Sequence, residues 1–89
     1  MPQIEVHFSG RVQGVGFRYT TSQIASRFAV TGFVQNLSDG RVRMVAQGDS
    51  RELDSFLDAI KERMSSNIRD VAIERQTSDS HFDGFVIKR

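Results

Sequence analysis

Apolar and polar residues alternate at the start of the chain and then change to a longer period. In QIEVHFS, residues 3–9, every second side chain is apolar, which predicts a strand with one buried face. In residues 18–30 the side chains suited to a core recur at spacings of three and four, which predicts a helix. The inward positions are Ile4, Val6 and Phe8 of the strand and Thr21, Ile24, Ala25 and Phe28 of the helix.

The middle of the chain predicts a hairpin and a second helix. Residues 32–47 contain two runs of β-forming residues around an Asp-Gly turn signal, which is typical of a β-hairpin. Residues 48–64 carry apolar side chains at helical spacing, and these are Leu53, Phe56, Leu57, Ile60 and Met64. We expect Asp49 or Ser50 to cap this helix, and Glu52 to complete a capping box with Asp49.

Two further strands, at residues 68–75 and 82–89, complete the order βαββαβ plus a short C-terminal strand. Such an order predicts an α+β fold, the ferredoxin-like split βαβ arrangement, with two helices on one face of an antiparallel sheet. The first two strands then run in the same direction, with the third strand between them. The loop after the first strand and the end of the second should therefore share one edge of the sheet, roughly 10 Å apart.

The connection between the first strand and the first helix is unusually rich in glycine. GRVQGVGFR contains Gly10, Gly14 and Gly16, and a loop that leads into a helix can direct backbone N–H groups at an anion. Arg18 adds a planar guanidinium that grips phosphate through two parallel hydrogen bonds. The Walker A and dinucleotide patterns are absent, which favours a small phosphate or carboxylate over a nucleotide. A tight turn beside a surface arginine explains the same residues equally well.

Two segments taken together resemble a known family. GRVQGVGFR, residues 10–18, followed by GFVQN, residues 32–36, closely resembles the two signature segments of the acylphosphatase family. The SDGRV turn, the GD before the second helix and the terminal FVIKR fit the same family, so the resemblance covers nearly the whole chain. The family often ends in Arg-Tyr, whereas this chain has Lys88 and Arg89 at that place.

The resemblance implies an enzyme that hydrolyses the carboxyl–phosphate anhydride of small acyl phosphates, without a metal or another cofactor. It places the phosphate, or inorganic phosphate or a similar anion, in the loop of residues 13–18. Arg18 and Asn36 are then the catalytic residues: Arg18 holds the phosphate and Asn36 orients the attacking water. The substrate-binding residues implied are Gln13, Gly14, Val15, Gly16, Phe17 and Arg18.

Other functions remain open at this point. Acylphosphatase-like domains also occur in hydrogenase-maturation proteins that handle carbamoyl phosphate, and a non-catalytic anion-binding or partner-binding module could keep the same loop. Ferredoxin-like sheets also bind RNA through exposed aromatic residues. However, the second strand of the predicted hairpin, RVRMVAQ, has no aromatic residue on either face, so no nucleic-acid partner is expected.

The composition of the chain excludes several kinds of functional site. The 89 residues include no cysteine, which excludes disulfides, thiolate zinc sites and cysteine nucleophiles, and no His, Asp and Glu cluster has metal-ligand spacing. No segment has the pattern of a signal peptide or a membrane span, so we expect a cytoplasmic protein without a membrane partner. Without a linker, a repeat or a spare apolar seam, residues 1–89 are expected to form a single domain and a monomer.

The two halves of the chain differ in charge. Residues 1–48 carry five arginines and two acidic residues, giving +3, whereas residues 49–89 carry seven basic and nine acidic residues, giving −2. An anion would therefore prefer the first half, while the total of +1 is too small to favour a nucleic acid.

A few further residues have the chemistry for a site but occupy less informative positions. His7 lies on the polar side of the first predicted strand and is expected to face solvent. Phe17 and Phe33 are expected to flank the phosphate site and to pack the loop and the second strand. Arg41 and Arg43 are expected to be solvated side chains of the hairpin.

Overall fold

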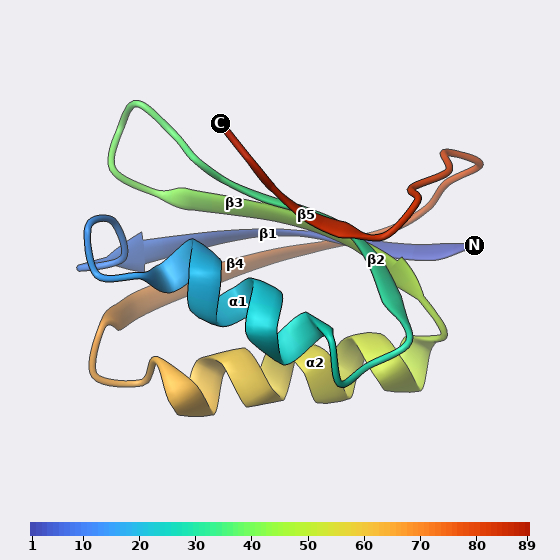
Figure 1. Ribbon diagram of the computed structural model, residues 1–89, viewed down its shortest axis with the longest axis horizontal. Coiled ribbons are helices and arrows are strands. Elements are labelled where there is room, and N and C mark those ends of the chain that lie inside the picture. The colour runs from blue at the N-terminus through green and yellow to red at the C-terminus, as the bar shows by residue number, and fades with distance from the viewer.

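Five strands and two helices follow one another in the predicted order (Figure 1). The computed structural model describes all 89 residues. The strands are β1 (Pro2–Gly10), β2 (Val30–Asn36), β3 (Val42–Gly48), β4 (Ile68–Thr77) and β5 (Phe85–Lys88). The helices are α1 (Phe17–Ala25) and α2 (Ser50–Arg63). None of the helices is long and apolar enough to cross a membrane.

The strands form one sheet in the order β4-β1-β3-β2-β5. Strand β3 pairs antiparallel with both β1 and β2, so β1 and β2 run in the same direction on either side of it. Strand β5 pairs parallel with β2 and forms one edge of the sheet. This topology confirms the predicted ferredoxin-like fold class and brings the ends of β1 and β2 to the same edge.

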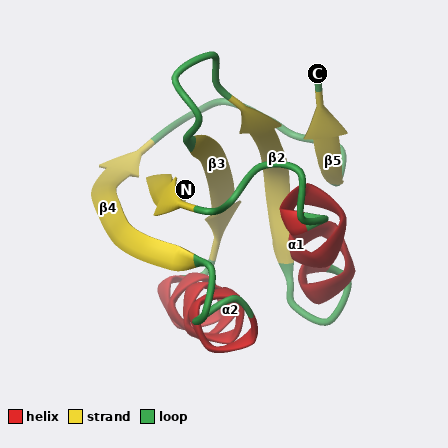
Figure 2. Cartoon of the chain, turned by 90° about the vertical axis from the view of Figure 1, so that its left-hand side faces the viewer, coloured by secondary structure: helices red, strands yellow, loops and turns green.

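Both helices cover the same face of the sheet. Helix α1 packs against β2 and β5, and α2 against β1 and β3, which leaves the other face free of helices (Figure 2). The inward residues of β1 are at most 1% exposed, and the apolar side chains predicted for the second helix are buried in the same core. Because a slip by one residue would turn these side chains to solvent, their burial fixes the register of the sheet.

Two local predictions were wrong. Helix α1 ends at Ala25 rather than continuing to residue 30, because the N–H groups of Arg27 and Phe28 bond the carbonyls three residues before them and close the helix in tight turns. The capping box also fails: Asp49 caps α2 as expected, but the Glu52 carboxylate accepts the N–H of Ala29 at 2.7 Å instead.

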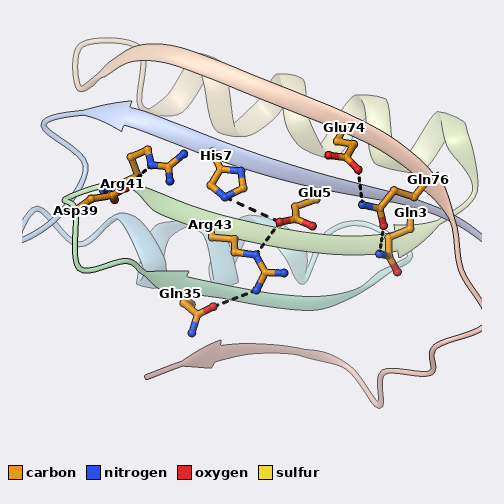
Figure 3. Close-up of polar contacts among 9 residues, drawn as sticks. All are labelled: Gln3, Glu5, His7, Gln35, Asp39, Arg41, Arg43, Glu74 and Gln76. Atoms are coloured by element: carbon orange, nitrogen blue, oxygen red, sulfur yellow. Dashed lines mark hydrogen bonds and ion pairs between the residues drawn. The ribbon is translucent and has the colours of Figure 1, made fainter.

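A polar network crosses the face of the sheet that has no helices (Figure 3). Arg43 on β3 donates to Glu5 on β1 at 2.9 Å and to Gln35 on β2 at 3.3 Å. Nearer the other end of these strands, Gln3 accepts from the amide of Gln47 and donates to that of Gln76, both at 2.7 Å. These bonds join four neighbouring strands, β4, β1, β3 and β2, on this face.

The Glu5–Arg43 pair gives the fold a defined response to acid. The hydrogen bond from Arg43 holds the pKa of the Glu5 carboxyl below its ordinary value of 4.5. Since the folded state favours the ionised form, the pair stabilises the fold above pH 4.5, and this stabilisation disappears as the pH falls through the lowered pKa. We expect Glu5→Gln to reduce the free energy of unfolding by roughly 0.5–1 kcal/mol near neutral pH, and by less in acid.

Thermal unfolding of both proteins across the acidic range measures this difference directly. Glu62→Gln serves as the matched control, because Glu62 is an exposed acid of α2 that forms no ion pair. A difference in melting temperature between Glu5→Gln and the wild type that stays constant with pH would contradict this account of the pair.

Candidate active site

A cleft of about 680 Å³ opens at the edge of the sheet where β1 and β2 end. The loop after β1, the start of α1, the end of β2, and β5 with the residue that follows it all contribute to the cleft. Its lining residues are Val12, Gly14, Gly16, Phe17, Arg18, Tyr19, Asn36, Ile87 and Arg89. The glycine loop and Asn36 therefore lie on one cleft, as the parallel arrangement of β1 and β2 predicted.

The two glycines that line the cleft are needed for the path of the backbone. Gly14 has φ 75° and Gly16 has φ 78°, in the left-handed region that side chains disfavour. A Cβ atom at either position would meet no atom within 4 Å outside the glycine and the two residues next to it. The glycines therefore make no room for another part of this chain, and they leave the backbone of the loop open to a molecule in the cleft.

The backbone N–H groups of this loop have no acceptor within the protein. Outside the helices and strands, no hydrogen bond is donated by the N–H of any residue from 13 to 19, and the first bond of α1 runs from Thr20 to Gly16. Gly16 caps α1 without a side chain, and the first turn has no acidic residue. Unpaired N–H groups at the positive end of a helix form an arrangement that suits an anion.

Arg18 lies in the first turn of α1, is partly buried and lines the cleft. Its guanidinium takes part in no ion pair and no side-chain hydrogen bond of the structure, whereas Arg41 and Arg43 are both paired with carboxylates. No acidic residue lines the cleft to neutralise it. The five donors of this side chain are therefore available to an anion.

Asn36 ends β2 and is partly buried at the wall of the cleft. Its Oδ1 atom is enclosed and has no hydrogen-bond partner. Almost all buried polar atoms in proteins are paired, and leaving one unpaired costs about 1–3 kcal/mol. The side-chain amide of Asn36 is therefore suited to hydrogen-bond a molecule that enters the cleft. Rotation about its Cβ–Cγ bond can present either the oxygen as an acceptor or the nitrogen as a donor.

Gln13 positions the loop relative to Asn36. Its side-chain amide donates to the carbonyl of Leu37 at 2.7 Å and to that of Arg41 at 2.9 Å. Leu37 directly follows Asn36, so these bonds fasten the loop to the β2–β3 hairpin beside the amide. No sequence pattern indicates this contact, because both acceptors are backbone carbonyls more than twenty residues away.

The remaining residues of the predicted site separate into two groups. Phe17 is buried below the loop, where its ring centroid lies 4.9 Å from that of Phe8, and Val15 is 39% exposed and does not line the cleft. Phe33 does not flank the site, so that prediction was wrong. It lies on the other face of the sheet, where its ring contacts Phe82 and Lys88, because an odd number of positions along β2 separates it from Asn36.

Other side chains are placed as follows. His7 lies on the helix-free face, 3.9 Å from Glu5 and away from the cleft. Tyr19, Ile87 and Arg89 line the cleft although the sequence did not indicate them. In no part of the structure do three or more His, Cys, Asp or Glu side chains form a group that could hold a metal ion.

The fold and the cleft together define a ferredoxin-like α+β protein in which the glycine loop, an unpaired arginine and Asn36 line one opening. A family model described as acylphosphatase matches residues 4–87. The chain belongs to the acylphosphatase family and is an enzyme of that family.

Comparison of the chain with individual proteins supports membership of the same family. The chain is 36% identical to an acylphosphatase from Oceanobacillus iheyensis over 99% of both sequences. The crystal structure of acylphosphatase from Bacillus subtilis matches it with a TM-score of 0.90 and 33% identity over 100% of both chains. The crystal structure of HypF from T. kodakarensis matches with a TM-score of 0.86 but 24% identity, and the match covers only 12% of HypF. This last similarity shows a shared fold.

Proposed function

We propose that the chain hydrolyses the carboxyl–phosphate anhydride bond of small acyl phosphates and releases a carboxylate and phosphate. The observation that carries this proposal is that the guanidinium of Arg18, which has no partner, lines the same cleft as the loop of residues 13–19, whose N–H groups are unpaired. Together they match the charge and the several oxygens of a phosphoryl group. Family membership supplies the substrate class.

In the proposed reaction the loop and Arg18 hold the phosphoryl group, and Asn36 orients a water molecule for attack on phosphorus. The bond between phosphorus and the acyl oxygen breaks, and its electron pair leaves with the carboxylate. A phosphate oxygen of the substrate takes the proton of the water. Because a carboxylate is a good leaving group and the transition state is loose, positioning and fixed positive dipoles suffice, and we propose that no metal takes part.

Turnover of benzoyl phosphate by the purified chain in excess EDTA tests this proposal. We expect rapid hydrolysis, followed through the loss of ultraviolet absorbance of the acyl phosphate. Folded protein that leaves benzoyl phosphate at the uncatalysed rate would overturn the proposed function. Turnover that appears only when a divalent metal is restored would overturn the metal-independent mechanism.

The same assay separates the competing functions. Carbamoyl phosphate as the sole substrate would indicate a role like that of the larger maturation proteins, and phosphate binding without turnover would indicate an anion-binding module. RNA binding has little support in the structure, because Phe33, the aromatic side chain of the central strands on the helix-free face, is only 9% exposed. A monomer in the cytoplasm stays a prediction from the sequence.

A further inference from the structure

A second arginine lines the cleft, and the proposed reaction at the phosphate does not use it. Arg89 follows β5, which pairs parallel with β2 so that Lys88 lies beside Gln35. The next residue along each strand is therefore Arg89 beside Asn36, and both line the cleft. Arg18 approaches the same opening from α1, so two guanidinium groups on different elements share it.

Arg89 faces the cleft because of the alternation along its strand. Ile87, two residues earlier, lines the cleft, whereas Lys88 lies on the other face with its ammonium 4.6 Å from the ring centroid of Phe33. The Arg89 side chain takes part in no ion pair and no side-chain hydrogen bond, and it is exposed. No acidic side chain lines the cleft to neutralise this guanidinium.

The part of the cleft contributed by β5 and α1 combines this charge with less polar surface. Ile87 is 40% exposed and Tyr19 is 64% exposed, so both offer apolar contact area to a ligand. The loop and Arg18 together suffice to bind one phosphoryl group. Arg89 is therefore free to contact the part of the substrate that is attached to the phosphate. In the proposed reaction that group is the acyl chain.

We infer that Arg89 makes this enzyme prefer acyl phosphates whose acyl group carries a second negative charge, such as a further carboxylate. This inference rests on the proposed function and names the substrate class within it. The phosphoryl group occupies the loop, the acyl chain lies along Tyr19 and Ile87, and its distal anion approaches the guanidinium of Arg89. A neutral acyl group of the same size makes the first two contacts and not the third.

A pair of substrates of equal size tests the inference. We compare kcat/KM for 4-carboxybenzoyl phosphate with that for 4-carbamoylbenzoyl phosphate, and repeat the comparison with the 3-substituted pair to vary the position of the charge. In each protein we take the ratio of kcat/KM for the charged substrate to kcat/KM for the neutral one. Any general effect of a substitution on turnover cancels in this ratio. We expect Arg89→Gln to lower this ratio about three- to fivefold, the upper part of the range for an exposed ion pair.

Three further variants separate charge from structure. Arg89→Glu should lower the ratio below that of Arg89→Gln, and Arg89→Lys should restore much of it, because the lysine keeps the charge without the planar fork. Lys88→Gln is the matched control, since it removes the neighbouring charge from the other face of the sheet, and it should keep the wild-type ratio. In the wild type the preference should weaken as the salt concentration rises.

The outcomes distinguish the two proposals. Equal ratios in the wild type and Arg89→Gln, for both positions of the carboxylate, would overturn the inference while leaving the proposed function intact. A fall in the ratio of the same size in Lys88→Gln would also overturn it, because the effect would then come from the overall electrostatic potential and not from a contact with Arg89. If the wild type hydrolyses neither the charged nor the neutral compounds, the proposed function fails and this inference fails with it.

Discussion

Replacing Arg18 with alanine is expected to lower kcat for benzoyl phosphate by about 10³-fold or more. Removing one strong transition-state donor costs on the order of 10²–10³ in rate, and a guanidinium that grips two phosphate oxygens belongs at the upper end of that range. Its donors have no other partner in the protein, so alanine removes their full contribution from the cleft. The affinity for inorganic phosphate, measured as product inhibition, should fall as well.

Two comparisons make this prediction specific. Arg18→Lys keeps the positive charge but loses the planar pair of donors, and it should remain strongly impaired. Arg51→Ala removes the same charge from an exposed position in the first turn of α2, outside the cleft, and should keep nearly full activity. Near-normal turnover by folded Arg18→Ala would remove this residue from the mechanism.

The order of the elements and their faces could be predicted because both depend on local pattern. Alternation in residues 3–9 and helical spacing in residues 48–64 require only the neighbours along the chain, and both predictions were confirmed. The end of α1 could not be predicted in this way. Phe28 continues the helical spacing, yet the chain must turn after Ala25 so that β2 can begin at Val30 and pair with Gly48.

The site was partly predictable for the same reason. Arg18 and Asn36 belong to segments with a recognisable pattern, and the topology alone brings those segments to one edge of the sheet. Gln13 as a clamp and Arg89 as a cleft residue depend on contacts between segments far apart in the sequence. The prediction for Phe33 was wrong because this residue is close to Asn36 along the chain but not in space: the strand alternation turns its ring to the other face of the sheet.

The cleft differs from the helix-free face of the sheet in how its polar groups are paired. On the helix-free face, amides and charged groups bond one another from strand to strand. At the cleft, the N–H groups of the loop, the guanidinium of Arg18 and the Oδ1 atom of Asn36 have no such partners. Unpaired polar groups reduce stability, and proteins keep them mainly where a ligand completes the pairing.

Asn36→Ala therefore separates catalysis from stability. We expect kcat for benzoyl phosphate to fall by about 10²-fold, the lower end of the range for losing one group that acts on the transition state, because water is no longer oriented for attack. The affinity for inorganic phosphate should change much less, because the loop and Arg18 remain. The melting temperature should stay equal or rise, since the substitution removes a buried acceptor that has no partner.

Gln35→Ala is the matched control for this experiment. It removes an amide from the adjacent position of β2, but that side chain lies on the other face and accepts a hydrogen bond from Arg43. This variant should lose a little stability and keep its kcat, the reverse of what is expected for Asn36→Ala. If Asn36→Ala instead unfolds at a lower temperature and keeps its kcat, the amide serves the fold, and a different group must orient the water.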